Sequence, residues 1–403
     1  MSYEIAASGL NAVNEQLDGI SNNIANAGTV GYKSESTQFS AMYADSQAMG
    51  VSVSGTAQSI SRGGSMVSTG NNLDLAINDD GFFVMCDSAG NISYTRAGSF
   101  TTDKNGYITN SAGDYLQGYP VDDSGTLQTG TVSDIQIQTG NIPAEATTEL
   151  NFVANFDASD TAIDTTKTPF DPTDVNSYND SYTTTVYDSL GNEHSVSQYF
   201  TKTADNTWEV HYTFDGEVQN DASGDPEVQT LTFDSTGKLQ SPTTAPSLTF
   251  ETDGAAPITM SFDYSACTQY GSDFSVTTND ADGYASAEQN GVQVDGDGKV
   301  YATYSNGERM LQGQVVLATF PDENALEAVS GTAWVQTGAS GTPLIGVPGS
   351  GACGSLSTGM LEGSNVDLTS ELVDLMTAQR NYQANTKVIS TSTQLDDALF
   401  QAM

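Results

Sequence analysis

The side chains that most often perform chemistry in proteins are few in this sequence and far apart. His194 and His211 lie within alternating, strand-like segments, where exposure on a strand face accounts for both. Cys86, Cys267 and Cys353 form no CxxC pair, and three thiols cannot all pair. We therefore expect these cysteines to be small buried side chains rather than metal ligands.

The common catalytic and phosphate-binding motifs are missing. The sequence contains no GxSxG, no GxxxxGK[ST] and no HExxH. The segment Asp295–Val300 resembles a calcium loop but lacks the Gly at position six and the Glu at position twelve, so we expect a hairpin turn. Acidic clusters at Asp79–Asp80 and Asp221–Asp225 are expected to be solvated loops, with weak Ca²⁺ binding as the alternative. The sequence therefore predicts no enzyme activity, no cofactor and no metal site.

The chain is strongly acidic. Its 403 residues include 11 Lys and Arg and 51 Asp and Glu, so the net charge is 11 − 51 = −40. Such a chain repels polyphosphates, which argues against nucleic acid and anionic lipid as partners. No apolar run approaches the roughly 20 residues that span a bilayer, and the N-terminus has no secretory signal pattern. We therefore predict neither membrane insertion nor a cleavable signal peptide.

Both ends of the chain carry the apolar periodicity of a coiled coil. Residues 1–28 and 364–403 are predicted to form helices that pair as a helical core and polymerisation domain. Asn365 or Asp367 can cap the second helix, and Gly28 can end the first. The predicted packing positions are Leu10, Val13, Leu17, Ile20 and Ile24 in the first helix and Leu368, Leu372, Leu375, Tyr382 and Ile389 in the second.

The opposite faces of these two helices are polar but carry few charges. One interpretation is a two-helix coiled coil confined to one chain. We favour a pair that also packs against neighbouring copies, because uncharged polar faces are buried with hydrogen bonds at lower cost than charged ones.

The middle of the chain is predicted to be mainly β. Segments of alternating polarity recur there, and the stretch from Tyr182 to Asp215 indicates a three-stranded meander. Asp-x-x-Gly sequences, typical of tight turns, separate the segments. These turns are Asp87–Gly90, Asp103–Gly106, Asp122–Gly125, Asp188–Gly191, Asp234–Gly237 and Asp295–Gly298. The predicted fold class is multidomain and mainly β, with terminal α-helices that pair as a coiled coil around two nested β-rich domains.

Composition divides the middle into nested parts. Residues 146–284 hold 23 acids and 3 bases, a net −20 in about a third of the chain. We interpret this block as an acidic outer β domain inserted into an inner β domain made of residues 71–145 and 285–363. Residues 29–70 alternate only weakly and are expected to be an extended linking segment that orders against a partner.

Three groups of motifs resemble the bacterial flagellar rod and hook protein family. The first is Ser8–Ala12 with Leu17–Asn26 and Gly31–Ser34, the second is Leu73–Ile77 with Gly81–Phe83 and Tyr94–Phe100, and the third is Leu361–Leu368 with Ala378–Asn385. The residues of this family signature are Asn22, Asn23, Asn26, Gly31, Tyr32, Gly81, Phe82, Arg96, Asn365, Gln379 and Arg380.

The inserted acidic block distinguishes this chain from the shorter rod members and makes it similar to the hook members. The resemblance implies a structural subunit that is exported by the flagellar type III apparatus and self-assembles outside the cell. The product would be a curved, flexible tube that transmits torque from rod to filament, with the rod, hook cap and hook–filament junction proteins as partners. A distal rod or junction protein is the near alternative, and a secreted β-rich binding protein or hydrolase is the distant one.

Overall fold

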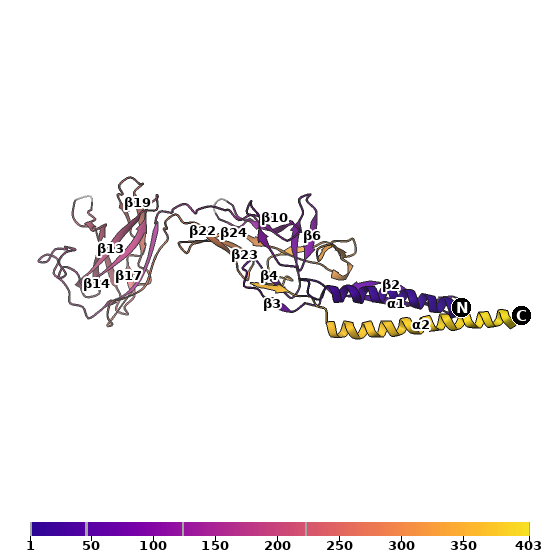
Figure 1. The fold of residues 1–403 in the computed structure, drawn as a ribbon. Coiled ribbons are helices and arrows are strands. Elements are labelled where there is room, and N and C mark those ends of the chain that lie inside the picture. The colour runs from indigo at the N-terminus through magenta and orange to yellow at the C-terminus, as the bar shows by residue number, and fades with distance from the viewer. Residues whose placement is uncertain (1, 45–46, 123–124, 222–223, 403) are drawn as a thin grey trace. The chain divides into compact units, whose positions relative to one another are not determined.

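A computed structural model describes residues 2–44, 47–122, 125–221 and 224–402 (Figure 1). These residues form two compact units. The first comprises residues up to 139, residues 290–303 and the chain from 309 onward, and the second comprises residues 140–289 and 304–308. The chain is mainly β, and its two long helices pack together, so the predicted fold class is confirmed.

The helices of the first unit are α1 (Ser2–Ala25) and α2 (Leu368–Ala402). As predicted, Asp367 caps α2, because its Oδ1 accepts the backbone N–H groups of Thr369 at 2.9 Å and Ser370 at 3.4 Å. Neither Gly nor Pro interrupts α2. Within the described part of the chain, neither helix combines the length and apolarity needed to cross a membrane.

The predicted end of the first helix at Gly28 is wrong. Helix α1 ends at Ala25, and the left-handed residue comes later, at Gly31 (φ 71°). Side chains on the segment between them continue the hydrogen bonding: Asn26 Nδ2 donates to the Asn22 carbonyl, and Thr29 Oγ1 donates to Asn26 Oδ1. Only Gly fits at position 31, where a Cβ would lie 2.6 Å from the Ala97 backbone nitrogen.

The linking segment takes a more definite form than the sequence indicates. Strands β1 (Glu35–Ala44) and β2 (Gln47–Gln58) pair with each other as a long antiparallel hairpin that also contacts α1. Thr37 Oγ1 donates to the Glu15 carbonyl of α1, and Ser8 Oγ accepts the N–H of Val51. The segment therefore forms its own backbone hydrogen bonds within one chain.

The remaining strands of the first unit surround an aromatic core. Phe82 contacts Trp334 and Phe320 edge to face, with ring centroids 5.6 and 6.0 Å apart. Most of these strands belong to one large sheet, with β4–β29 and β3–β30 as separate pairs. The strands are β3 (Met66–Ser68), β4 (Leu75–Asn78), β5 (Phe82–Cys86), β6 (Ile92–Thr95), β7 (Thr101–Thr102), β8 (Ile108–Thr109), β9 (Tyr115–Pro120), β10 (Ser133–Asp134), β22 (Gln289–Val294), β23 (Lys299–Tyr304), β24 (Arg309–Val315), β25 (Leu317–Thr319), β26 (Glu327–Val329), β27 (Ala333–Val335), β28 (Leu344–Gly346), β29 (Ser355–Thr358) and β30 (Met360–Glu362).

The second unit contains two sheets whose buried residues form one core. The predicted meander is present as β12, β13 and β14 of the six-stranded sheet, and the five-stranded sheet is centred on β11. Phe156 of β11 lies against Phe200 and Trp208 of the other sheet, with ring centroids 5.0 and 5.1 Å away. The strands are β11 (Glu149–Asp157), β12 (Asp180–Tyr187), β13 (Glu193–Ala204), β14 (Thr207–Phe214), β15 (Glu217–Val218), β16 (Val228–Phe233), β17 (Leu239–Ser241), β18 (Ser247–Phe250), β19 (Ile258–Asp263), β20 (Thr268–Tyr270) and β21 (Ser275–Ala281).

Five of the six predicted Asp-x-x-Gly turns are confirmed, and the sixth, Asp122–Gly125, has the same bond between its ends while residues 123–124 lie outside the described residues. In each, the Gly N–H donates to the Asp carbonyl at 2.9–3.1 Å, and the Gly has a positive φ. In the turn at Asp188, burial alone would raise the carboxyl pKa, but hydrogen bonds from Asn192 and Leu190 lower it to about 2. Polar side chains therefore fix the turns that set the strand register.

The pKa values of the two histidines in the second unit are shifted in opposite directions. His211 is 5% exposed and stacks on Phe170, with ring centroids 4.2 Å apart. Burial lowers the His211 pKa to about 4. Burial alone would also lower the pKa of His194, but Asp215, whose Oδ2 lies 2.7 Å from Nδ1, and Asp188 raise it.

We expect His211 to weaken the second unit in acid. An unfolded chain binds a proton at His211 below a pKa of about 6.5, whereas the folded chain resists until about pH 4, so unfolding becomes easier as pH falls through this window. His211→Phe keeps the stacked ring but cannot bind a proton. In the wild type, His211 should lower the free energy of unfolding by up to about 1.4 kcal/mol for each pH unit in this window, and the variant should not show that decrease. Urea unfolding of the full chain at pH 7, 6, 5 and 4 measures it.

His194→Asn is the matched control, because the pKa of His194 is shifted in the opposite direction to that of His211. The raised pKa of His194 means that its stabilisation is present in acid and is lost as pH rises through that pKa. The variant should therefore lose stability mainly at low pH. Parallel pH profiles for the wild type and His211→Phe would contradict the assignment of acid sensitivity to His211.

Candidate functional site

The predicted packing residues of α1 lie on its contact with α2. Val13 and Ile20 are buried, Leu17 and Ile24 pack against them from the same helix, and Leu10 is half-buried. Their partner in α2 is Ala378, which is fully buried. The predicted stripe of α1 is therefore a real contact surface within one chain.

The predicted stripe of α2 divides between two faces. Leu375 packs against α1 and Ile389 is half-buried, whereas Leu368, Leu372 and Tyr382 are 48%, 51% and 39% exposed. The centre of the contact runs instead through residues such as Ala378 and Asn385, whose small or polar side chains carry little apolar signal. Three of the five predicted α2 positions are therefore left uncovered in the single chain.

Asn23 connects α1, the hairpin and α2. It is 1% exposed, and its Nδ2 donates to the Glu35 carbonyl at 2.8 Å and to Glu371 Oε1 at 2.9 Å. Its Oδ1 accepts the Glu35 N–H at 2.9 Å and the Tyr32 hydroxyl at 3.2 Å. Burial, Glu35 and Glu371 raise the Tyr32 pKa to about 12, so this hydroxyl remains a donor at neutral pH. All four hydrogen-bonding positions of the buried amide are satisfied.

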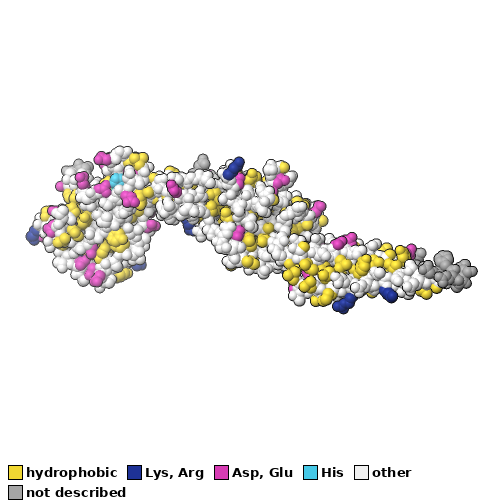
Figure 2. Space-filling view, in the orientation of Figure 1, with side chains coloured by type: hydrophobic (Ala, Val, Ile, Leu, Met, Phe, Trp, Pro, Cys, Tyr) yellow, Lys and Arg dark blue, Asp and Glu magenta, His cyan; other side chains and the backbone are white. Residues whose placement is uncertain are grey.

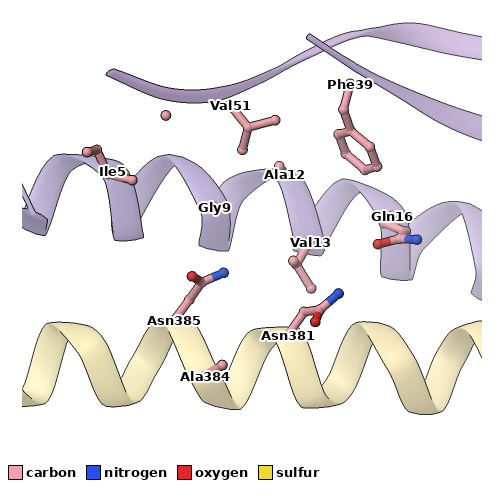
Figure 3. Close-up of a pocket in the computed structure, with 11 residues that line it drawn as sticks. Ile5, Gly9, Ala12, Val13, Gln16, Phe39, Val51, Asn381, Ala384 and Asn385 are labelled. Carbon is pink, nitrogen blue, oxygen red and sulfur yellow. The ribbon is translucent and has the colours of Figure 1, made fainter. Parts of the chain in front are cut away.

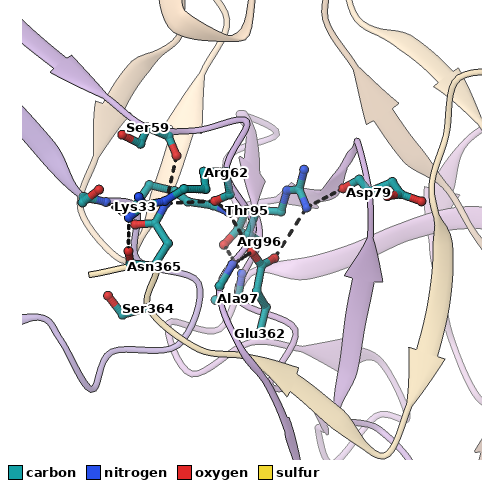
Figure 4. Close-up of polar contacts among 12 residues, drawn as sticks. Lys33, Ser59, Arg62, Asp79, Thr95, Arg96, Ala97, Glu362, Ser364 and Asn365 are labelled. Atoms are coloured by element: carbon teal, nitrogen blue, oxygen red, sulfur yellow. Dashed lines mark hydrogen bonds and ion pairs between the residues drawn. The ribbon is translucent and has the colours of Figure 1, made fainter. Parts of the chain in front are cut away.

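A buried ion cluster joins three distant parts of the first unit (Figure 4). Glu362 Oε1 lies 2.7 Å from Lys33 Nζ, and Glu362 Oε2 lies 3.5 Å from Arg96 Nη1. All three side chains are at most 2% exposed. Burial lowers the Lys33 pKa although Glu362 opposes this shift. One carboxylate is thus shared between two buried cations.

Backbone groups complete the coordination of these charges. Lys33 Nζ donates to the Arg62 carbonyl at 2.8 Å, and Arg96 Nη1 donates to the Asp79 carbonyl at 2.8 Å. The Arg96 guanidinium also lies 5.2 Å from the centre of the Phe82 ring. Glu362 Oε1 accepts the Gly64 N–H at 2.8 Å.

Asn365 lies beside this cluster and joins both ends of the chain (Figure 4). Its Oδ1 accepts the Ser34 N–H at 2.6 Å, and its Nδ2 donates to the carbonyls of Ser59 and Arg62 at 2.9 and 2.8 Å. The Arg62 guanidinium donates in turn to the Asn365 carbonyl. The start of α2 is thereby fixed to the end of the hairpin.

The other signature residues have different surroundings. Asn22 Nδ2 donates to Glu35 Oε1 at 3.2 Å, and Gly81 has a positive φ directly before the buried Phe82. Gln379 and Arg380 are exposed on α2. The structure thus brings most of the signature to the junction between helices and sheet and leaves these two on the surface.

The predicted site residues do not include Lys33 and Glu362, whose side chains form the 2.7 Å ion pair of the junction. Lys33 and Glu362 lie inside quoted motifs, next to Tyr32 and near Asn365, but neither was singled out. The scarcity of bases was the available signal, since three of only 11, Lys33, Arg62 and Arg96, meet around one carboxylate and one amide.

The geometry of these contacts is suited to holding parts together rather than to reaction. The Asn23 and Asn365 amides and the Lys33 ammonium bond to other groups of the chain, and the described residues contain no group of three or more His, Cys, Asp or Glu able to hold a metal ion. Exposed hydrophobic side chains gather along the helices (Figure 2).

Family models match four parts of the chain. The model described as "Flagella basal body rod protein" matches residues 4–33, and "Flagellar hook protein FlgE/F/G D1 domain" matches 76–164. "Flagellar basal body protein FlaE D2 domain" matches 155–284, and "Flagellar basal body rod FlgEFG protein C-terminal" matches 357–402.

Curated relatives extend the similarity to the full length. The chain is 39% identical over 404 residues to the flagellar hook protein FlgE of Salmonella typhimurium strain LT2, with 99% of each chain covered. Identity is 38% to FlgE of Escherichia coli K12 and 34% to FlgE of Brucella suis. A crystal structure of Helicobacter pylori flagellar hook protein FlgE2 has the same fold, with a TM-score of 0.54 at 15% identity over 73% of this chain and 100% of that one.

Proposed function

Because the chain belongs to the family of flagellar hook proteins named FlgE, we propose that α1 and α2 hold its copies together in the polymeric hook. The protein is a structural, non-enzymatic subunit of the hook, an extracellular part of the flagellum. The observation that carries the proposal is the uncovered apolar face of α2, where Leu372, Val373 and Met376 are 49–52% exposed. Faces of this kind on soluble proteins mark contact surfaces.

The partners at the two ends of the hook follow from the same helices. Residues 4–33 and 357–402 match models shared with basal body rod proteins, which supports stacking of the first subunits on the rod. We propose the hook cap and the hook–filament junction proteins as further partners, and the flagellar type III apparatus as the export route.

The two units suit different tasks in a flexible joint. The inner helices, with few charges, supply a continuous core that transmits torque. The second unit, with a sandwich-like aromatic core of its own, is a stiff body whose contacts with neighbours change as the tube bends. Within the proposal, residues 146–284 are the outer domain, residues 71–145 with 285–363 the inner one, and residues 29–70 the link.

Deletion of residues 146–283 tests this division. The chain enters and leaves the second unit as neighbouring strands, because Glu145 and Tyr284 exchange two backbone hydrogen bonds of 3.0 Å each. A two-residue Gly bridge therefore closes the gap without strain. We expect tubes that assemble but no longer curve, visible by electron microscopy. Loss of all tubes from a variant that is still secreted would place the second unit in the assembly core.

The function itself is tested in a strain without the gene. Basal bodies purified from it should end at a completed rod with no hook, and the wild-type gene should restore hooks. Complete hooks in the deletion strain would contradict the proposed role. Hooks that lack only an attached filament would indicate a junction protein instead.

A further inference from the structure

A groove runs along one side of the helical pair (Figure 3). It has a volume of about 470 Å³ and is bounded by α1, α2 and the β1–β2 hairpin. Small residues create it: Gly9 and Ala12 on α1 and Ala384 on α2. Phe39 and Val51 of the hairpin form an apolar wall, and Phe39 is still 43% exposed. None of the described residues that line the groove is charged.

The register of the helices leaves the end of α2 without a partner from α1. Asn23 bonds Glu371, and a Cβ on Gly9 would lie 2.8 Å from Asn385 Nδ2, so residue i of α1 lies opposite residue 394 − i of α2. Ser2, the first residue of α1, therefore lies level with residue 392. Residues 393–402 extend past it by about 15 Å at the helical rise (Figure 1).

The exposed face of α2 that adjoins residues 393–402 is largely apolar. Residues at spacings of three and four line a second hollow of about 560 Å³ on α2 alone: Ala384, Lys387, Val388, Thr391, Ser392 and Leu395. Val388 is 47% exposed and Leu395 67% exposed. This face, defined here as the Val388–Leu395 face, is about two-thirds as long as the groove, which extends along α1 from Ile5 to Gln16.

Charge favours contact between α2 of one chain and α1 of another. Helix α1 carries Glu4, Glu15 and Asp18 and no base. Between Asp374 and Asp396, α2 carries Arg380 and Lys387 and no acid. In a chain of net charge −40, this is one of the few basic surfaces available to meet an acidic one.

We propose that the groove receives the Val388–Leu395 face of a second copy of the chain. This inference rests on the proposed function and adds which surfaces meet. Groove and face are different patches, so each subunit uses one to hold the next and leaves the other free. Contacts between two different patches repeat without closing, as a helical tube requires.

Cysteine cross-linking tests the contact in assembled hooks. The three native cysteines are replaced by alanine, and hooks are confirmed in that background. Phe39→Cys and Val388→Cys chains are then produced separately and together in one cell. After mild oxidation, a disulfide-linked dimer is expected only in hooks that contain both variants. Leu344→Cys, exposed on β28 and away from both helices, replaces Val388→Cys in the control.

Three outcomes are distinguishable. A dimer of Phe39→Cys with Val388→Cys chains supports the inference. Hooks that form normally but give this dimer no more often than the Leu344→Cys control overturn the inference and leave the proposed function intact. An unmodified chain that makes no hooks overturns the proposed function itself.

A second variant keeps the inference testable if the cysteine chains assemble poorly. Leu395→Asn changes a side chain that is already 67% exposed, so the monomer should unfold as the wild type does. The yield of polymer sedimented from purified subunits should fall at least tenfold. Leu344→Asn, at 61% exposure on β28, is the matched control and should leave the yield unchanged. Equal yields for both variants would overturn the inference.

Discussion

Replacing Glu362 with Gln is expected to lower the free energy of unfolding of the first unit by about 3–5 kcal/mol. The change removes the carboxylate that forms ion pairs with the buried Lys33 and Arg96, whose side chains are 1% and 2% exposed. The second unit shares none of these contacts, so its unfolding transition should stay in place and serve as an internal reference. Urea unfolding of the full chain at pH 7 measures both transitions.

Two further variants test whether loss of the ion cluster causes the destabilisation by Glu362→Gln. Glu327→Gln removes an exposed carboxylate of the same unit and should change stability by less than about 0.5 kcal/mol. Lys33→Met together with Glu362→Gln removes a cation and the anion together and should recover part of the loss. A Glu362→Gln chain as stable as the Glu327→Gln chain would mean that the ion cluster does not hold the first unit closed.

Ile20→Asp is expected to abolish hook assembly. Ile20 is 6% exposed against α2, and an unpaired carboxylate there costs several kcal/mol and separates the helices. The chain should still be detected in the culture medium, because the change does not touch the β units. Electron microscopy of basal bodies and immunoblots of the medium measure the two effects.

Asn11→Asp is the matched control for this experiment. Asn11 is exposed on the same helix, and the substitution adds the same charge with less change in shape. We expect the strain that carries Asn11→Asp to swim normally. Hooks of normal length in the Ile20→Asp strain would show that the contact of α1 with α2 is not needed in the polymer.

Local patterns in the sequence predicted local structure well. The helices follow from apolar periodicity, Asp367 caps α2 as expected, and the Asp-x-x-Gly turns lie where the sequence places them. Each of these features depends on residues a few positions apart. The chemistry of capping and of tight turns therefore fixes them before any tertiary contact forms.

Features that depend on distant residues were only partly predictable. The β1–β2 hairpin was hidden because register shifts at Gln38/Phe39 and Met42/Tyr43 interrupt the alternation of its side chains. The face of α2 toward α1 was misplaced because Ala378, fully buried, contributes little hydrophobicity. The motifs located Asn23 and Asn365, but nothing in them reveals that Glu362 pairs with Lys33.

The sequence separation of that pair determines when the first unit can finish folding. Lys33 and Glu362 are 329 residues apart. A chain that is delivered N-terminus first therefore cannot form this ion pair until almost all of its residues have been delivered. The second unit, whose contacts lie within residues 140–289 and 304–308, is complete earlier. Because the second unit is inserted within the first, we expect the second unit to fold first. The first unit folds last, once α2 is available to pack against α1. Late closure delays the pairing of α1 with α2 until the subunit is whole.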